Sequence, residues 1–564
     1  MNNKPKIAVF DLTGCQGCEF HLLSLDESLA DLFQDFEIIN WRLLKEPAPG
    51  DFDVAFVEGA ATTAGHIELL KKIRATSKIV VALGACAITG NVFAGLTAEQ
   101  REAAAKKIYG DDYKIKAEFL EPIEKFIKVD EKIQGCPPDI EAFKTFLQKI
   151  KGTFMDSPKI NVAPPDYTAK IEGHATLCVD FNKRAATFKV EESERLIEEL
   201  LVGKTYSQAP FINSRVCGIC PISHNLCSWA AIENALKMKI TSETILLREL
   251  LMCGQIIKSH LMHLFFLVLP DYAGLKGSIE LSTKYPAEFH LMLNLKRLAD
   301  NILKVVAGSD AFPTNTGLGG FIKPPEINAL SEIKEKIYDV LDEAAGLIEL
   351  FGAFNYAKVE TDLEFLTIDS PKNQYPLYYS KSIANVTEII DKRSTTKFGV
   401  VDSRPVKVGA LARLALAQKK LNPLARKFFE QYNVNIHNPF SNNLAQAIEI
   451  LHFLEESTKL IEKLEGKEME RTSVQRPSAI VGQCTGMASL EAPRGTLIHQ
   501  VEINPDLTIA KYNIIPPTQI NLAALQVEIP ALLAQTKNLA PKEVERELEK
   551  LIRAFDPCIT CAVH

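Results

Sequence analysis

Residues 6–20 read KIAVFDLTGCQGCEF, a β-rich apolar run that leads into two cysteines, Cys15 and Cys18. Two similar runs follow at residues 53–59 (DVAFVEG) and 78–84 (KIVVALG), with a helical pattern at 67–75 between them. Short continuous apolar strands that alternate with helices are typical of a parallel, doubly wound sheet. The sequence therefore predicts an α/β domain at the start of the chain.

Four cysteines are expected to meet at one edge of this sheet. Cys15 and Cys18 follow the first run, Cys86 follows the third, and Cys136 lies in QGCPPD, where two prolines force a turn before an amphipathic helix. Ligands of such sheets bind beyond the carboxyl ends of the strands. Glycine beside Cys86 and Cys136 favours a 4Fe-4S cluster held by four thiolates, while a zinc site and simply buried thiols stay open on spacing alone.

The rest of the chain predicts a second, larger domain that is mainly helical with a minor β part. Residues 151–165 (KGTFMDSPKINVAPP) carry the Gly, Ser and Pro residues of a linker, so we expect a linker at 153–165 between domains at 1–152 and 166–564. Residues 170–181 and 185–192 predict a small β element. Helical patterns occupy residues 191–203, 227–239, 243–269, 286–307, 329–355, 409–432, 441–465 and 541–554.

Composition argues against some classes of partner. The formal net charge of the 564 residues is −7, so neither nucleic acid nor an anionic membrane surface is expected as a main partner. The first residues show no signal peptide, and the most apolar window, 256–269, contains Lys258, His260 and His263. We expect that window to be a buried helix rather than an integral membrane segment.

These features predict a cytoplasmic protein, a reducing setting in which the 12 cysteines are ligands rather than disulfides. Isolated cysteines in apolar surroundings usually behave as small core residues. Four cysteines are expected in the core for this reason: Cys178, Cys227, Cys253 and Cys484.

Two further cysteine pairs share CxxC spacing. Cys217 and Cys220 lie in RVCGICPISHNLC (215–227), and Cys558 and Cys561 lie in DPCITCAVH (556–564). Four thiolates in two such pairs suit zinc, iron or nickel about equally well, so spacing alone does not choose. The flanking residues do, because RVCGICPISH and DPCITCAVH closely resemble the signature motifs RxCGxCxxxH and DPCxxCxxH of the large subunit of NiFe hydrogenases.

Further motifs match this family in its own order. KIEGHA (170–175) resembles its early RIEGH motif with Lys170 in place of arginine, and EAPRG (491–495) resembles the motif with its active-site arginine. The N-terminal CQGC, GAC and GCPP resemble the family's small subunit. The chain thus looks like a small, proximal-cluster subunit with a flavodoxin-like sheet fused to a large subunit. Complex I subunits share both folds, but they have generally lost the nickel cysteines that this chain keeps.

The resemblance implies a nickel–iron centre. Cys217 and Cys558 would be terminal nickel ligands, while Cys220 and Cys561 would bridge nickel to an iron that carries CO and cyanide. The resemblance also implies a magnesium ion bound by Glu198 and His564.

Roles around this centre follow from the same resemblance. Arg494 would stand over the open metal position, with Pro493 and Asp556 completing the canopy. Glu172 would accept the proton through Cys558, and His224 would donate a hydrogen bond to a bridging cysteine sulfur. Ser259 stands where many members of the family carry an aspartate. Glu19, beside Cys18, is expected either at the interface with the nickel–iron site or as an exposed residue at a helix start.

The implied activity is reversible heterolytic cleavage of H2 to protons and electrons. Electrons would pass through one 4Fe-4S cluster on Cys15, Cys18, Cys86 and Cys136 to an external electron-carrier protein, ferredoxin-like or another redox subunit. No cysteine remains for a further cluster, and no GxGxxG fingerprint for a nucleotide follows the first strand. Maturation machinery is an expected partner, because the family's large subunit is often trimmed after the motif's histidine. The alternatives are an H2-sensing regulatory hydrogenase and a non-catalytic complex I-like metalloprotein.

Overall fold

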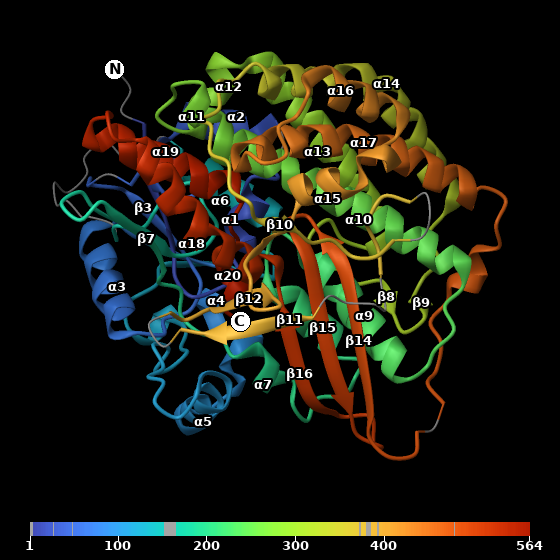
Figure 1. The fold of residues 1–564 in the computed structure, drawn as a ribbon. Helices are drawn as coiled ribbons and strands as arrows, with labels where there is room; N and C mark the ends of the chain where they lie inside the picture. The colour runs from blue at the N-terminus through green and yellow to red at the C-terminus, as the bar shows by residue number, and fades with distance from the viewer. Residues whose placement is uncertain are drawn as a thin grey trace.

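The computed structural model describes residues 4–25, 27–47, 49–151, 165–370, 374–379, 385–391, 394–478 and 480–564. The predicted linker, 153–165, lies outside the described residues except for Pro165. The N-terminal domain, blue in Figure 1, packs against the helices of the larger domain, and the last residues of the chain are buried inside the molecule.

The N-terminal domain is built on a parallel five-stranded sheet of order β2-β1-β3-β4-β5, which is the flavodoxin-like order. The three predicted strands are present, and the strand at each edge of the sheet was not predicted. β3 is buried at all five positions, as expected for a strand covered on both faces. The strands are β1 (Lys6–Asp11), β2 (Glu37–Trp41), β3 (Val54–Glu58), β4 (Ile79–Leu83) and β5 (Glu131–Ile133).

Helices follow the strands and place the cysteine loops. α3 begins after Thr63, whose side chain accepts a hydrogen bond from the backbone N–H of His66 and caps the helix. α6 is the amphipathic helix expected after Cys136, and its apolar face packs on the sheet through Phe143 and Phe146, which contact Phe56. The helices are α1 (Gly17–Leu22), α2 (Glu27–Asp35), α3 (Ala64–Thr76), α4 (Gly84–Thr89), α5 (Ala98–Tyr109) and α6 (Ile140–Ile150).

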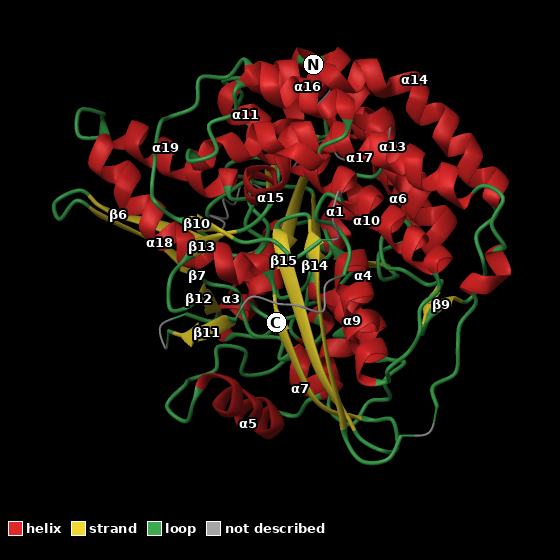
Figure 2. Cartoon of the chain, turned by 45° about the vertical axis from the view of Figure 1, so that its right-hand side comes forward, coloured by secondary structure: helices red, strands yellow, loops and turns green. Residues whose placement is uncertain are grey.

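The larger domain has a core of long helices, in which α10 packs against α13 and α17 and α14 packs against α17. Figure 2 shows this helical layer above a smaller β region. The helices are α7 (Ile197–Leu201), α8 (Ala209–Asn213), α9 (Pro221–Ala235), α10 (Ser242–Met262), α11 (Leu269–Tyr272), α12 (Leu281–Lys284), α13 (Pro286–Ala307), α14 (Ile327–Gly352), α15 (Ala410–Ala417), α16 (Pro423–Tyr432), α17 (Asn442–Leu464), α18 (Pro517–Gln535), α19 (Pro541–Ala554) and α20 (Ile559–Ala562).

Three helix predictions were wrong in extent. Only α7 forms within the predicted helix 191–203, and the predicted helix 409–432 divides into α15 and α16. Pro423 starts α16, because proline suits a first helical position and not a helix interior. The helix predicted at 227–239 starts earlier, at Pro221.

A three-stranded antiparallel sheet of β14, β15 and β16 runs beside α9 and was not predicted. Figure 2 shows β14 and β15 as long neighbouring strands, and the turn between them carries Arg494. The predicted β element near residue 180 is confirmed as the hairpin of β6 and β7. The strands are β6 (Ala175–Asp180), β7 (Ala185–Val190), β8 (Thr316–Gly317), β9 (Gly320–Phe321), β10 (Glu364–Phe365), β11 (Val386–Ile390), β12 (Lys397–Val401), β13 (Val406–Lys407), β14 (Cys484–Ala492), β15 (Gly495–Ile503) and β16 (Ile509–Ile515).

The apolar window 256–269 lies in a continuous helical segment, Ser242–Tyr272, which is long and apolar enough to cross a membrane but is mostly buried inside the protein. The prediction of a buried helix is therefore confirmed. Of the isolated cysteines, Cys227 and Cys253 are buried as predicted. Cys178 is exposed, so its prediction was wrong, because β6 belongs to a hairpin with one face toward solvent; Cys484 is only partly buried.

Candidate metal centres

The two CxxC pairs of the larger domain converge in the interior. Cys217 and Cys220 lie in the loop before α9, and Cys558 and Cys561 lie at the start and inside of α20. The sulfur atoms of Cys217 and Cys558 are 3.2 Å apart, and those of Cys217, Cys220 and Cys561 lie within 4.8 Å of one another. All four side chains are buried. The structure thus brings together residues that are more than 330 positions apart in the sequence.

The charge of this cluster fits a metal. Burial raises the pKa of the Cys217 thiol, but hydrogen bonds from Cys220, Cys558 and Cys561 outweigh burial and lower it well below its usual value. Burial and hydrogen bonds with the other three cysteines raise the pKa of Cys558 well above its usual value. Four thiols this close cannot all ionise without a cation, and four thiolates are ligands that soft metals such as nickel and iron accept. The donor set therefore fits a nickel–iron group.

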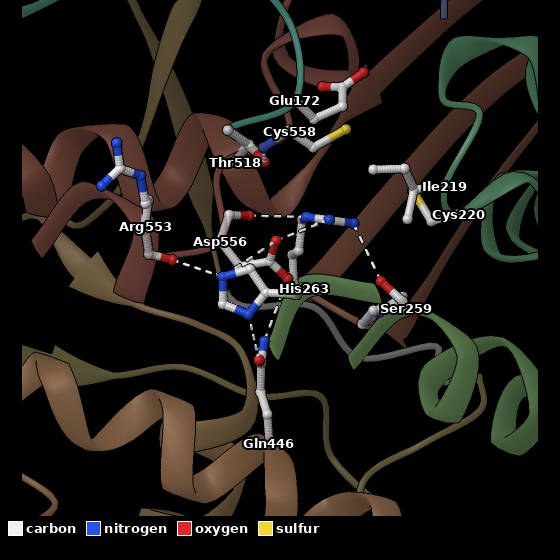
Figure 3. Close-up of polar contacts among 12 residues, drawn as sticks. Glu172, Ile219, Cys220, Ser259, His263, Gln446, Thr518, Arg553, Asp556 and Cys558 are labelled. Carbon is white, nitrogen blue, oxygen red and sulfur yellow. Dashed lines mark hydrogen bonds and ion pairs between the residues drawn. The ribbon is translucent and has the colours of Figure 1, made fainter. Parts of the chain in front are cut away.

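Arg494 lies against this cluster at the turn between β14 and β15. Its Nε and Nη2 donate to the carbonyl oxygen and to Oδ1 of Asp556, both at 2.8 Å, and its Nη1 lies 3.4 Å from Ser259 Oγ. Figure 3 shows Asp556 and Ser259 on the two sides of this guanidinium. Burial opposes its charge, but Asp556 and the cysteines raise the pKa of Arg494, so it stays protonated.

A second group of side chains supports Asp556 and was not predicted from the sequence. Gln446 Nε2 donates to Asp556 Oδ2 at 3.2 Å, and Gln446 Oε1 lies 2.5 Å from His263 Nδ1. His263 Nε2 in turn lies 2.7 Å from the carbonyl oxygen of Arg553 (Figure 3). The sequence pattern indicated His263 only as part of the apolar helix and not as a site residue. Pro493, the predicted canopy residue, accepts a hydrogen bond from Arg413 at 3.1 Å and borders a cavity with Arg494 and Asp556.

Glu172 lies beside Cys558, and the two residues form an isolated parallel β-bridge (Figure 3). The backbone N–H of Thr560 donates to Glu172 Oε2 at 3.1 Å, and the Thr560 hydroxyl donates to Oε1. Burial, reinforced by the charge of Cys217, raises the pKa of Glu172 to about 8. A carboxyl group with a pKa near neutrality can both accept and release a proton.

His224 contacts Cys561 and begins a chain of hydrogen-bonded buried side chains. His224 Nε2 lies 3.1 Å from Cys561 Sγ, His224 Nδ1 lies 3.2 Å from His499 Nε2, and His499 Nδ1 lies 2.9 Å from Tyr512 Oη. Burial lowers the pKa of His224 to about 3 and that of His499 well below its usual value, so both rings are neutral. A neutral imidazole has one donor, so a thiolate at Cys561 requires the proton on His224 Nε2 and therefore on His499 Nε2. His499 was not identified from the sequence.

Glu198 and His564, predicted as magnesium ligands, lie together. His564 Nε2 is 2.9 Å from Glu198 Oε1, and His564 Nδ1 is 3.0 Å from the carbonyl oxygen of Cys561. Burial opposes ionisation of Glu198, but His564 lowers its pKa to about 2. Carboxylate and carbonyl oxygens are the donors that a hard cation prefers, so this set fits magnesium in part.

The four N-terminal cysteines meet at the carboxyl edge of the parallel sheet. Cys15 follows β1, Cys18 lies in α1, Cys86 lies in α4 and Cys136 follows β5. Asn91 Nδ2 lies 3.4 Å from the sulfur of Cys136 and 3.7 Å from that of Cys86. Burial and the neighbouring Cys136 raise the pKa of Cys86 to about 12, so this set also needs a cation to hold several thiolates.

Glycine makes room beside these sulfurs. A Cβ on Gly84, whose φ is +79°, would lie 2.4 Å from Cys18 Sγ. Backbone without side chains next to the sulfurs suits a compact iron–sulfur group. Glu19 is buried and accepts a hydrogen bond from Trp41 Nε1 at 2.8 Å, so the alternative of an exposed helix-start residue was wrong.

The two cysteine loops touch through their glycines. The backbone N–H of Gly218 donates to the carbonyl oxygen of Cys15 at 2.8 Å, and a Cβ on Gly218 would lie 2.2 Å from Gly17 Cα. The loop that carries Cys217 and Cys220 therefore packs backbone to backbone on the loop that carries Cys15 and Cys18. The two candidate centres are neighbours across the domain interface.

Comparison with known proteins shows the family of the chain. Residues 195–342 and 355–564 match the family described as nickel-dependent hydrogenase, and residues 15–150 match NADH ubiquinone oxidoreductase, 20 Kd subunit. The chain belongs to the nickel-dependent hydrogenase family, and it joins a small-subunit-like domain and a large-subunit domain in one polypeptide. It is an oxidoreductase acting on H2.

Curated relatives cover the larger part of the chain. Sulfhydrogenase 2 subunit alpha of Pyrococcus furiosus is 30% identical over 71% of this chain and 98% of its own length. Sulfhydrogenase 1 subunit alpha of the same organism is 29% identical over 71% and 97%. Among solved structures, an NAD+-reducing [NiFe]-hydrogenase in the H2-reduced state has a TM-score of 0.59 at 23% identity, covering 70% of this chain and 97% of that chain. This last likeness concerns the fold.

Proposed function

We propose that the protein catalyses the reversible heterolytic cleavage of H2 to protons and electrons and passes the electrons through one 4Fe-4S cluster to an external acceptor. The observation that carries this proposal is the convergence of four buried cysteines, 217, 220, 558 and 561, against the guanidinium of Arg494. Family membership supports the same reaction.

A nickel–iron group with CO and cyanide on iron, when bound, would supply the electron-rich position at which H2 is polarised. Cys217, Cys220, Cys558 and Cys561 would hold this group through their sulfur atoms. His224 would direct its Nε2–H at the Cys561 sulfur and so stabilise the negative charge there. Magnesium at Glu198 and His564 belongs to the same proposal.

The protein side of the reaction is charge placement and proton movement. Asp556 fixes the Arg494 guanidinium with two hydrogen bonds, so the cation points at the centre without rearranging. The Cys558 sulfur would pass the proton to Glu172, whose carboxylate Thr560 holds in place.

Electrons would leave through the N-terminal domain. Asn91, which contacts two of its cysteines, also lines a surface groove with Val92, Val202 and Phe211. Val92 and Val202 are each more than one-third exposed, so the groove presents apolar side chains to solvent. We propose that an electron-carrier protein, ferredoxin-like or another redox subunit, docks at this groove. The expected domains, 1–152 and 166–564, correspond to the electron-transfer and catalytic halves.

Metal analysis and H2 uptake of the anaerobically purified chain test the proposal. We expect one nickel, one active-site iron and about four cluster irons per chain, because four cysteines hold one cubane. We also expect H2-dependent reduction of an artificial acceptor. Nickel-loaded protein without turnover would contradict the catalytic proposal, and about 12 cluster irons would contradict the single cluster.

A further inference from the structure

Arg195 is a buried cation that the proposed reaction does not use. Its side chain is fully buried, just before α7. The guanidinium donates to the carbonyl oxygens of Arg215 at 2.9 Å and Val216 at 2.8 Å, and also to those of Thr560 and Val563. All of these acceptors are neutral peptide oxygens, and within the described part of the chain Arg195 forms no ion pair with a carboxylate.

Glu192, an acidic residue that Arg195 influences, is already balanced by other cations. Arg195 contributes to lowering the pKa of Glu192, but Glu192 lies 2.8 Å from His174. Asp11 pairs with both His174 and Arg42. Burial opposes the charge of His174, but Glu192 and Asp11 raise its pKa to about 10, so it is protonated at neutral pH. Two anions and two cations therefore cancel in this group. The two buried carboxylates that flank Arg195 in the sequence have other partners: Glu194 accepts from the Tyr113 hydroxyl and the Ala117 backbone, and Glu198 contacts His564.

A buried guanidinium without a countercharge is strongly unfavourable, so a negative charge close by has to compensate it. The geometry points to the cysteine sulfurs. Arg195 binds the peptide just before Cys561, the peptide that joins Val563 to His564, and the peptide just before Cys217. On its other side it stacks 5.2 Å from the ring of Phe93, in the segment that follows the Cys86 helix.

Arg195 also lies close to the N-terminal cysteines. Val216, whose carbonyl oxygen Arg195 binds, lies two residues before Gly218, and the backbone N–H of Gly218 donates to the carbonyl oxygen of Cys15 at 2.8 Å. One guanidinium therefore contacts the walls of one candidate centre and lies within electrostatic reach of the other.

We propose that Arg195 is an electrostatic and positioning residue that supplies the countercharge shared by the two metal–thiolate centres and ties together the segments that carry the nickel ligands. The proposal rests on the proposed function, because thiolate-bound metals provide the negative charge. A fixed positive charge stabilises the reduced cluster more than the oxidised cluster, since reduction adds an electron. Arg195 would thereby raise the reduction potential of the cluster and favour electron flow away from the nickel site.

Arg195→Gln in the metal-loaded protein tests this charge. We expect the ratio of reduced to oxidised cluster at a fixed potential, followed by electron paramagnetic resonance, to fall about tenfold, which is about 59 mV for one electron. Arg195→Lys keeps the positive charge, so the reduction potential of its cluster should stay close to that of the unmodified protein. Arg101→Gln is the matched control, because Arg101 is equally buried and donates to the carbonyl oxygens of Ala117 and Glu194.

The outcomes separate the possible explanations. If the cluster has the same reduction potential in Arg195→Gln as in Arg101→Gln, the countercharge role of Arg195 is overturned. If Arg195→Gln does not fold, Arg195→Lys provides the test. Normal metal content with an unchanged cluster potential in Arg195→Lys would support the countercharge role. Failure of Arg195→Lys to fold would show that the five-donor hydrogen-bonding geometry dominates and would overturn that role. Absence of nickel or cluster iron from the unmodified protein would instead refute the proposed function.

Discussion

Glu172 connects the nickel-site cysteines to a group that can carry a proton. It forms a β-bridge with Cys558, and its carboxylate is held by the Thr560 backbone and hydroxyl. In Glu172→Gln the amide oxygen can still accept from Thr560, but the side chain cannot take up a proton. We expect H2 uptake to fall by about 10²-fold or more, the size typical of losing a general base.

Nickel and iron content separates this proton role from a structural one. Both should match the unmodified protein in Glu172→Gln, and Glu172→Asp should recover part of the activity. Uptake within about twofold of the unmodified protein would show that the proton leaves by another route, because a general base contributes far more than that.

His499 sets the direction of the hydrogen bond on Cys561 without touching it. In His499→Leu the Nδ1 of His224 loses its partner at 3.2 Å, so the ring is no longer held with Nε2–H toward the sulfur. We expect activity to fall about 10-fold, as for other groups that orient a metal-site residue. The infrared bands of CO and cyanide on iron should shift as well.

His499→Gln provides the matched comparison, because an amide N–H can replace the donor to His224. It should restore most of the activity and the infrared positions, and Tyr512→Phe should produce a smaller shift, since it removes only the partner of His499. Identical infrared spectra for His499→Leu and the unmodified protein would show that His499 does not orient the hydrogen bond between His224 and Cys561.

The cysteines could be predicted as residues because their spacing and flanking motifs carry information along the chain. His499, Gln446 and His263 could not, because each acts through another side chain that only the fold brings near. His499 lies in β15, a strand that was not predicted, so no pattern showed which way its ring would face.

Among the elements, the loops of the two cysteine pairs show how tightly the centres are coupled. In Gly218→Ala the new Cβ would lie 2.2 Å from Gly17 Cα and 2.6 Å from the Cys15 carbonyl oxygen, and neither backbone atom can move aside cheaply. We expect the free energy of unfolding to fall by about 1–3 kcal/mol, as for other overpacked sites. Reduction of the cluster by H2 should also slow, because the loops have to separate.

Gly346→Ala in α14 is the control, since its Cβ would meet no atom within 4 Å. Alanine in an open helix position should raise the free energy of unfolding by about 0.5–1 kcal/mol. Denaturant titration and rapid-mixing reduction measure the two effects. Equal stability and equal reduction rates for the two variants would contradict the close contact of the loops.

The long amphipathic helices and the first, third and fourth strands of the N-terminal sheet were predictable because their hydrophobic patterns are regular. α18 was not, because it is apolar over most of its surface and is buried through most of its length, so it shows no single apolar stripe. The sheet of β14 to β16 was missed because the second half of β14 is buried at every position, which hides the alternation of a half-exposed strand.

For the whole molecule, the decisive feature is that the C-terminal segment fills the interior at the nickel-site cysteines. Residues 551–564 are all buried, and Lys550 just before them is partly exposed. Gln519 and Thr396 donate to the carbonyl oxygen of Ala562, and His564 contacts Glu198. No local pattern could predict this placement, because its partners come from three distant parts of the chain.

Residues added after His564 should therefore prevent completion of the nickel site. His564 is only 4% exposed, so a short polar extension, such as Gly-Ser-Gly-Ser, could not be accommodated without withdrawing the segment that carries Cys558 and Cys561. We expect such a variant to lose nickel while it keeps about four cluster irons, because the N-terminal cysteines lie on a separate sheet. The same extension placed before Lys4, which is exposed, is the control and should leave nickel content unchanged. Full nickel content and normal H2 uptake in the C-terminal variant would show that burial of His564 is not required for the site to close.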